Sequence, residues 1–270
     1  MPWCLILDTA HDAFTNMAID EAILQHTVAS STDSPTLRFY TWSCPSISIG
    51  RFQNIEQEIN LANCERDKVP VVRRPTGGRA VYHNSELTYS LTIPDSYPNI
   101  PSNITESYKV ISAGFVRGLK LLGINAQLER PKLVPRPSSL VPQSASPLCF
   151  ASTSRYEVTV NGKKLIGSAQ RRIQNAMLQQ GSILLDYDAE KDQRYFLANE
   201  SSSMASYVTG INQHLPAPVK LDTLINHLVQ GFATQLHVEF EPTTLNKLEK
   251  ILTDSLLTKK YQTRNWNYLR

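Results

Sequence analysis

Short apolar runs divided by Pro, Gly and Asn dominate the first hundred residues of the chain. These β-rich runs predict strands at 3–8, 36–41, 46–49, 69–73, 79–83 and 87–93. One helical pattern interrupts them at about 12–27, where the residues near one face are Phe14, Met17, Ala18, Ala22 and Ile23. The N-terminal part is therefore predicted to be mostly strand.

The rest of the chain alternates between helical and strand patterns. A helix is predicted at 104–122 and would pack across a sheet, because apolar residues recur there at helical spacing. Strands at 156–160, 164–170 and 177–186 follow, and Asn161-Gly162 signals a hairpin turn between the first two. Two amphipathic helices close the chain. We expect residues 1–270 to form a single catalytic domain, with 219–258 as its C-terminal helical part.

The segment 131–147 differs in composition, because it contains five prolines among serines and other small residues. Proline prevents a regular helix or a central strand, so this Pro/Ser-rich segment is predicted to be a loop. Loops of that length inside a compact domain are usually either functional or disordered. This loop leads directly to Cys149.

Length and charge limit the class of protein. The chain has 270 residues, a mass of 30.3 kDa and 41% hydrophobic residues, enough to bury a substantial core. Its net charge of +3 is too small to argue for a nucleic acid or a membrane surface as partner. The N-terminus shows no export signal, and no run approaches the roughly 20 apolar residues of a membrane span. We therefore expect a globular, cytoplasmic protein.

The cysteines are far apart and form no C-x-x-C pair, so neither a zinc site nor a disulfide framework is predicted. Cys4, Cys44 and Cys64 are expected to be core or loop residues. Cys149 differs because it ends the irregular loop and because a lysine lies on a nearby predicted strand. A neighbouring cation lowers the thiol pKa from its reference value of about 8.5, which gives a nucleophilic thiolate at neutral pH.

Lys164 is the candidate cation for this thiol. The alternative is that it is a solvated strand lysine, as Lys163 next to it could be. Adjacent strand positions point to opposite faces, so only one of the two can face a site. The corresponding alternative for Cys149 is an inert, buried thiol.

Two successive glycines, Gly77 and Gly78, lie between predicted strands. They permit positive φ angles and let a ligand approach main-chain N–H groups. The surrounding sequence is neither a phosphate loop nor a dinucleotide-binding motif, and a plain hairpin turn is the alternative. His83 ends the strand that leaves this turn and is a candidate functional residue. The other histidines lack ligand spacing, and no metal site is predicted.

Several motifs together resemble a known family, the lipoate/biotin protein ligase superfamily, and specifically its octanoyltransferase branch. The likeness runs from about residue 3 to at least 186, with a further match near the C-terminus. The segments that match in order are 16–22, 48–53, Arg73-Arg74-x-Thr-Gly-Gly-Arg-Ala-Val-x-His, 86–90, the Cys149 segment with 156–158, 167–171 and 266–267.

The resemblance implies an α+β, biotinyl/lipoyl protein ligase-like fold, with a mixed, mainly antiparallel sheet flanked by helices. It also implies a tunnel for a medium-chain acyl group. An octanoyl group would pass from the thioester of acyl carrier protein to the enzyme cysteine, and then to a lysine of an E2 lipoyl domain or of glycine-cleavage H protein. No cofactor and no ATP are expected.

The family motifs imply roles for particular residues. Cys149 matches the nucleophile, and Lys164 matches the lysine that would stabilise its thiolate and donate to the oxyanion of the thioester. The residues expected to bind the substrate are Arg73, Gly77, Gly78, Arg79, His83, Gly167, Ser168 and Ala169.

Three other functions remain open. An ATP-dependent lipoate ligase shares the fold, although such ligases typically carry a glycine where this chain has Arg79 and an Asp-x-Gly-Asn element where it has 84–87. An amidotransferase that moves octanoyl from H protein to other lipoyl domains also uses a cysteine. A non-catalytic module that binds carrier or lipoyl domains is the third, and it would gain no covalent octanoyl adduct.

Overall fold

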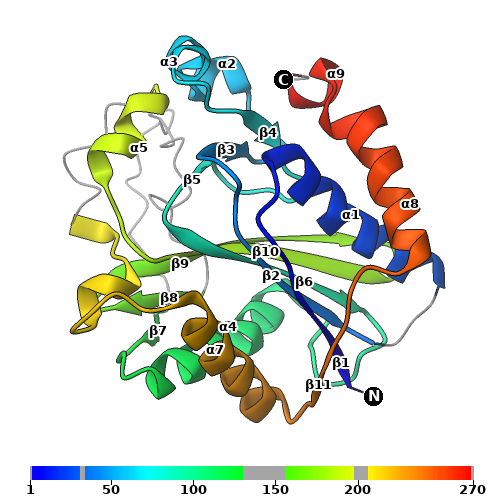
Figure 1. Ribbon diagram of the computed structural model, residues 1–270. Coiled ribbons are helices and arrows are strands. Elements are labelled where there is room, and N and C mark those ends of the chain that lie inside the picture. Colours follow the sequence, from blue (N-terminus) through cyan, green and yellow to red (C-terminus); the bar gives the residue numbers. More distant parts are fainter. Residues whose placement is uncertain (1, 31–33, 130–155, 198–205, 269–270) are drawn as a thin grey trace, which may run out of the picture.

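The computed structural model describes residues 2–30, 34–129, 156–197 and 206–268 (Figure 1). The predicted loop at 131–147 and Cys149 lie outside these residues. Within the described part no helix is long and apolar enough to cross a membrane. No group of three or more described His, Cys, Asp or Glu side chains could hold a metal ion.

The strands form two sheets. The larger has eight strands in the order β11-β1-β2-β6-β10-β9-β8-β7, and the smaller has three in the order β4-β3-β5. Their bounds are β1 Trp3–Leu7, β2 Thr36–Tyr40, β3 Ser46–Ile49, β4 Val71–Arg73, β5 Val81–His83, β6 Glu86–Pro94, β7 Gln127–Glu129, β8 Glu157–Val160, β9 Lys163–Ile173, β10 Ala176–Leu184 and β11 Phe240–Pro242. The β1/β11, β1/β2 and β3/β4 pairs are parallel and the other pairs are antiparallel. The predicted α+β fold with a mixed, mainly antiparallel sheet is confirmed.

Helices cover both faces of the larger sheet (Figure 1). α4 and α7 lie on one face, and α1 lies on the other together with α8 and the smaller sheet. The helix bounds are α1 Ala13–Ser30, α2 Ile55–Glu58, α3 Leu61–Arg66, α4 Ile104–Leu121, α5 Ala189–Tyr195, α7 Leu221–Leu236, α8 Lys247–Leu256 and α9 Arg264–Asn267, with a 3₁₀ turn at Ile211–His214 and a π-helical turn at Leu257–Tyr261.

The larger elements follow their predicted positions closely because their local signals are strong. Asn103 caps α4 by accepting hydrogen bonds from the N–H groups of Thr105 and Glu106, and Gly123 follows its C-terminal cap with a φ of 87°. The hairpin between β8 and β9 turns at Asn161 and Gly162, with φ values of 52° and 74°. Two positive φ angles are what a type I′ turn requires, so the predicted hairpin is confirmed.

The C-terminal segment is fastened to α1 by a buried carboxylate. Lys260 Nζ lies 2.6 and 2.8 Å from the two carboxylate oxygens of Glu21, and the hydroxyl of Tyr261 also donates to this carboxylate. Burial of Glu21 is tolerated because charged and hydroxyl donors surround it. The last helical elements are therefore packed against the helix that covers one face of the sheet.

The helix pair α4/α7 is packed backbone to backbone. A Cβ atom added to Gly231 would lie 2.3 Å from the amide nitrogen of Gly118 and 2.6 Å from the carbonyl oxygen of Gly114. Beside this contact the rings of Phe115 and Phe232 meet edge to face at 4.7 Å. Glycine at 231 therefore sets the distance between the two helices.

This packing predicts that Gly231→Ala separates α4 from α7. We expect the free energy of unfolding to fall by about 1–3 kcal/mol, the usual cost of overpacking a core. Urea denaturation of the full chain measures it. Gln230→Ala, an exposed position on the same helix, is the control and should change stability little; an equally stable Gly231→Ala variant would contradict the close helix contact.

Candidate active site

A small pocket, with a cavity volume of about 30 Å³, lies on the α1 side of the larger sheet. Its walls combine apolar side chains and two glycines with several polar side chains that can orient a ligand. The residues that line it are Met17, Tyr40, Trp42, Ser48, Arg74, Val81, His83, Thr88, Gly167, Ser168, Ala169, Gln180, Gly181 and Ser182. Four residues predicted to bind the substrate, His83, Gly167, Ser168 and Ala169, are therefore among its lining.

Strand register explains why this part of the sheet is hollow. One row of cross-strand pairs runs over four adjacent strands. It consists of Gly167 of β9, Ser182 of β10, Thr88 of β6 and Tyr40 of β2, each paired with the next. Directly paired residues project to the same face of an antiparallel sheet. A glycine and two small hydroxyl residues in one row leave space, and all four residues line the pocket.

His83 is held rigidly in the pocket wall. Its Nδ1 lies 2.7 Å from Glu86 Oε1, and its Nε2 lies 2.7 Å from Ser48 Oγ. Its ring stacks on Trp42 with the centroids 3.9 Å apart. Strands β3, β5 and β6 thus bring together a hydroxyl, an imidazole and a carboxylate in one buried chain of hydrogen bonds.

Glu86 is fully enclosed and accepts several hydrogen bonds. Donors besides His83 are Ser182 Oγ at 2.5 Å, Trp42 Nε1 at 3.2 Å and the hydroxyl of Thr88. Burial would raise the pKa of Glu86, but the charge of His83 and these donors outweigh it and hold the pKa below its usual value of 4.5. Glu86 is therefore an anion that orients His83.

Arg74 shapes the glycine turn beside the pocket. Its Nη2 donates to the carbonyls of Gly77 and Arg79 at 2.6 Å each, and its Nη1 donates to the carbonyl and hydroxyl of Ser48. Gly78 has a φ of 82°. The predicted residues Gly77, Gly78 and Arg79 thus lie in a turn fixed by a guanidinium that itself lines the pocket.

Gly50 completes this turn by its lack of a side chain. A Cβ atom there would lie 1.9 Å from the carbonyl oxygen of Gly78, so no other residue fits without moving the turn. A Cβ added to Gly78 would meet the Cβ of Ala169 at 3.4 Å. The glycine turn is thereby seated against the strand that lines the pocket.

Arg73 has contacts of a different kind from Arg74. Its guanidinium donates to the carbonyls of Gly50, Arg51, Gln53, Trp266 and Asn267, at distances between 2.8 and 3.1 Å. The side-chain oxygen of Asn267 accepts a bond from the Arg73 amide at 2.8 Å. These contacts join the C-terminal segment to the loop after β3, which is a structural role. The predicted role of Arg73 in substrate binding stays a prediction.

Lys164 lies in β9, three residues before Gly167, the first residue of this strand that lines the pocket. Its Nζ is 2.6 Å from Glu157 Oε1, and both side chains are more than nine-tenths buried. Lys163 is more exposed, as the alternation of adjacent strand residues predicts. Because Cys149 is outside the described residues, the predicted proximity of Lys164 to the thiol stays a prediction.

The three described cysteines are free thiols in unlike surroundings. Cys64 is buried, and burial together with the charge of Asp67 raises its pKa to about 11. Burial also raises the pKa of Cys4, while Cys44 is exposed. Raised pKa values make Cys4 and Cys64 poor nucleophiles at neutral pH.

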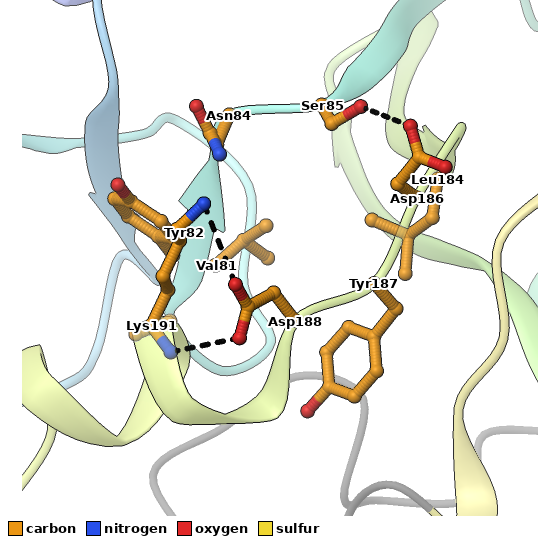
Figure 2. A pocket seen from close by; sticks show the side chains of 10 residues that line it. Val81, Tyr82, Asn84, Ser85, Leu184, Asp186, Tyr187, Asp188 and Lys191 are labelled. Carbon is orange, nitrogen blue, oxygen red and sulfur yellow. Dashed lines mark hydrogen bonds and ion pairs between the residues drawn. The ribbon is translucent and has the colours of Figure 1, made fainter.

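A second, larger hollow, with a cavity volume of about 340 Å³, shares Val81 with this pocket. Figure 2 shows its polar groups engaged with one another: Ser85 Oγ donates to Asp186 at 2.9 Å, and Lys191 Nζ lies 3.4 Å from Asp188. The rim is polar and charged, whereas the smaller pocket has walls suited to an apolar chain.

Sequence reasoning missed Ser48, Arg74, Glu86 and Glu157 as members or supports of the site. Glu86 stands three residues after His83, and Arg74 stands beside Arg73 in the same motif. Those spacings were the available signals. All four residues stand inside the family motifs, but none was named as part of the site. The pairing of Glu157 with Lys164 arises from the hairpin between β8 and β9, which no motif shows.

The fold and the comparisons with known proteins together identify an acyltransferase of the lipoyl protein ligase type. The family model of the lipoyl protein ligase A/B catalytic domain matches residues 12–233. Octanoyltransferase LipM of Kyrpidia tusciae is 40% identical over 278 residues, which cover 98% of each chain. Octanoyltransferase LipM of Bacillus subtilis is 37% identical over 94% of each chain. A bi-partite lipoate protein ligase of Thermoplasma acidophilum, solved in a study that includes its E2 lipoyl domain, has a TM-score of 0.81 at 26% identity and covers 100% of this chain and 98% of its own.

The chain therefore belongs to the lipoyl protein ligase A/B catalytic-domain family, and within it to the octanoyltransferases. The resemblance inferred from the motifs is confirmed, as is the acyltransferase class. Both relatives are matched over nearly their whole length.

The hydrogen-bonded carboxylate of Glu86 predicts a pH-dependent contribution to stability. Glu86→Gln should lower the free energy of unfolding by about 1–3 kcal/mol at pH 7, since a charge-assisted bond to His83 is lost. The folded pKa of Glu86 is lowered from 4.5, so the wild-type advantage is present above about pH 4.5 and is lost as the pH falls through the folded pKa.

Urea denaturation of both proteins at pH 7 and at successive pH values below 4.5 measures this difference. Glu65→Gln, at an exposed position of α3, is the matched control. A difference between wild type and Glu86→Gln that stays constant down to the lowest pH would contradict the assignment of a charged Glu86.

Proposed function

We propose that this protein transfers an octanoyl group from the thioester of acyl carrier protein, through a thioester on Cys149, to a lysine of a lipoyl domain or of glycine-cleavage H protein in lipoate biosynthesis. The observation that carries the proposal is the match to octanoyltransferases over nearly the whole chain, together with a pocket at the residues that the family motifs name. The Thermoplasma acidophilum ligase was studied with an E2 lipoyl domain, which supports a lipoyl-protein acceptor.

In both half-reactions the bonds and protons balance without a cofactor. In the first, the Cys149 thiolate attacks the carbonyl carbon of the donor thioester, and the bond from that carbon to the carrier sulfur breaks, so the carrier leaves as a thiol after taking a proton. In the second, the neutral acceptor amine attacks the same carbon, the bond to Cys149 breaks, and an amide forms with loss of one proton. Donor and acceptor need never be bound together.

Lys164 would serve both half-reactions through its charge. Glu157 fixes its ammonium at one position on β9, and a fixed donor costs no reorganisation when charge develops on the thioester oxygen. The acyl chain would run from there along Gly167 and Ala169 into the pocket. The glycine turn at 77–78 supplies backbone groups at its side.

Two rival enzymes share this fold. An ATP-dependent ligase would form an acyl adenylate, and this chain lacks the third glycine and the Asp-x-Gly-Asn element that such ligases typically carry. An amidotransferase would use the same cysteine with octanoyl-H protein as donor. Donor identity therefore separates the three, and no ATP requirement is expected here.

The central test replaces the nucleophile. Cys149→Ser should abolish both the octanoyl adduct on the enzyme and acylation of the acceptor while leaving the unfolding midpoint unchanged, because a serine hydroxyl without a strong base is far less nucleophilic than a thiolate. Intact-mass spectrometry after incubation with octanoyl-acyl carrier protein detects the adduct as the mass of one octanoyl group. Cys4→Ser, Cys44→Ser and Cys64→Ser are the controls and should keep the adduct.

The same assay separates the rivals. Apo H protein and an apo E2 lipoyl domain are offered octanoyl-acyl carrier protein without ATP, free octanoate with ATP, or octanoyl-H protein. Transfer only from free octanoate with ATP would identify a ligase, and transfer only from octanoyl-H protein would identify an amidotransferase. Retained turnover in Cys149→Ser would falsify the covalent mechanism.

Lys164 is predicted to act on the thiol through its charge. Lys164→Ala should move the pH midpoint of Cys149 alkylation upward, toward about 8.5, and slow acylation most at neutral pH. Lys164→Arg keeps the charge but not the compact geometry, so it should restore part of the alkylation shift and little of the transfer rate. Lys163→Ala is the control on the neighbouring residue.

Glu157→Gln adds a second readout, because it leaves the ammonium in place but removes the partner that fixes it. We expect slower transfer and a smaller effect on the alkylation midpoint than in Lys164→Ala. An unchanged alkylation profile in Lys164→Ala, or a larger shift in Lys163→Ala, would mean that the assigned lysine or the assumed strand register is wrong.

A further inference from the structure

The pocket ends at one identifiable row of the sheet. Ala169 of β9 and Gln180 of β10 are directly paired, and both line the pocket. The next pair whose side chains project to the same face is Arg171 and Leu178, and neither lines it. The pocket therefore ends at Ala169. This residue is five positions after Lys164 on β9, a distance of roughly 17 Å at the usual strand rise.

Behind this row the space is filled by the carboxylate of Asp20 from α1. Ser90 and Arg38 continue the same row on β6 and β2, and they lie 2.6 and 2.7 Å from Asp20 Oδ1. Gln180 Nε2 and the hydroxyl of Tyr40 donate to Asp20 Oδ2 at 2.7 and 2.8 Å. We name these five residues, Asp20, Arg38, Tyr40, Ser90 and Gln180, the Asp20 network.

An alkyl chain cannot extend into the Asp20 network without breaking hydrogen bonds to a buried charge. Such a charge left without a partner is strongly destabilising, whereas a methylene gains far less by its burial. Gln180 is further fixed by the hydroxyl of Thr76, which donates to its Oε1 at 2.8 Å. This end of the pocket is therefore rigid.

Met17 is the flexible side chain at this end. It stands one helical turn before Asp20 on α1, lines the pocket, and has its sulfur 3.4 Å from Gln180 Nε2. A methionine side chain adapts its shape to the space around it. Unlike the Asp20 network, it can be shortened or enlarged without leaving a charge unpaired.

We propose that Met17, packed over Gln180 and backed by the Asp20 network, sets the maximum length of the acyl chain that this enzyme accepts. The inference rests on the proposed function, because it takes the pocket as the acyl site with the reacting carbonyl at the Lys164 end. The ω end of an octanoyl chain lies against Met17. Each further methylene must displace that side chain.

The test compares donors of increasing length. Full-length wild type, Met17→Ala and Met17→Phe are incubated with hexanoyl-, octanoyl-, decanoyl- and dodecanoyl-acyl carrier protein, and kcat/KM for acylation is followed by intact-mass spectrometry. Met17→Ala should raise the decanoyl-to-octanoyl ratio about tenfold or more, since one methylene in an apolar pocket is worth about 10–200-fold in discrimination. Met17→Phe should lower the octanoyl-to-hexanoyl ratio by a similar factor.

Ile19→Ala is the matched control, because Ile19 is buried on the same helix but packs with Ile6 and Ile23 away from the pocket. It should lose stability as large-to-small core changes do, with no change in the ratios between chain lengths. If Met17→Ala does not fold, Met17→Val replaces it, and Met17→Phe tests the opposite direction independently.

The outcomes separate the inference from the proposed function. If wild type forms no adduct with any acyl carrier protein, the proposed function is wrong. If wild type is acylated but the length ratios of Met17→Ala, Met17→Phe and Ile19→Ala equal those of wild type, the length limit lies elsewhere and this inference is overturned. Opposite shifts in the two Met17 variants, with none in Ile19→Ala, support it.

Discussion

The buried carboxylate of Asp20 is the constraint on which the rest of the structure depends. It is fully enclosed, as is the guanidinium of Arg38 that pairs with it. The remaining donors come from Tyr40, Ser90 and Gln180, so residues of three sheet strands converge on one residue of α1. Removing one partner of a buried ion pair costs about 3–5 kcal/mol, because the other charge is left uncompensated. The carboxylate thereby fixes α1 at one position over the sheet.

That fixed position creates the pocket. α1 supplies Met17 at the pocket end, and the sheet supplies a row of small side chains below it. Gly167 and Ala169 leave room on the α1 face of β9, while Tyr89 occupies the opposite face, where its hydroxyl lies 2.8 Å from Ser168 Oγ. Burial raises the pKa of Tyr89 to about 12, so it is a neutral part of the sheet core. The hollow therefore persists because the helix above it and the sheet below it are both held by buried polar contacts.

Local patterns in the sequence predicted the fold well wherever an element carries its own signal. The amphipathic helix α4, its Asn103 cap and the Asn161-Gly162 turn are examples. The edge strands β7 and β11 were missed, because Gln127–Glu129 and Phe240–Pro242 each hold one large apolar residue and no β-rich run. Helix α1 was predicted, but the burial of its acidic residues was not. The partners of Asp20 and Glu21 are distant in sequence, and only the folded chain brings them together.

The same limit applies to the candidate site. The motifs contain residues that are neighbours in sequence, such as Arg73 and Arg74. Only the folded strands show which of two neighbours points into the pocket. Of Arg73 and Arg74, the second lines the pocket and the first binds the C-terminal segment. Sequence reasoning named the first, because periodicity in so short a strand cannot tell which side faces the ligand.

The two ends of the pocket along β9 differ as the two ends of an acyl thioester do, with a polar carbonyl at one end and an alkyl chain at the other. At the beginning of β9, Lys164 presents a fixed ammonium where the proposed mechanism puts the polar carbonyl. At the other end the wall is also polar, but every donor and acceptor around Asp20 is already engaged. A saturated network offers no hydrogen bond to a ligand and still resists deformation, because moving any member exposes a buried charge. An end built only from methionines and other flexible apolar side chains would yield to longer chains. A rigid polar network behind one flexible residue therefore gives an apolar pocket a defined length.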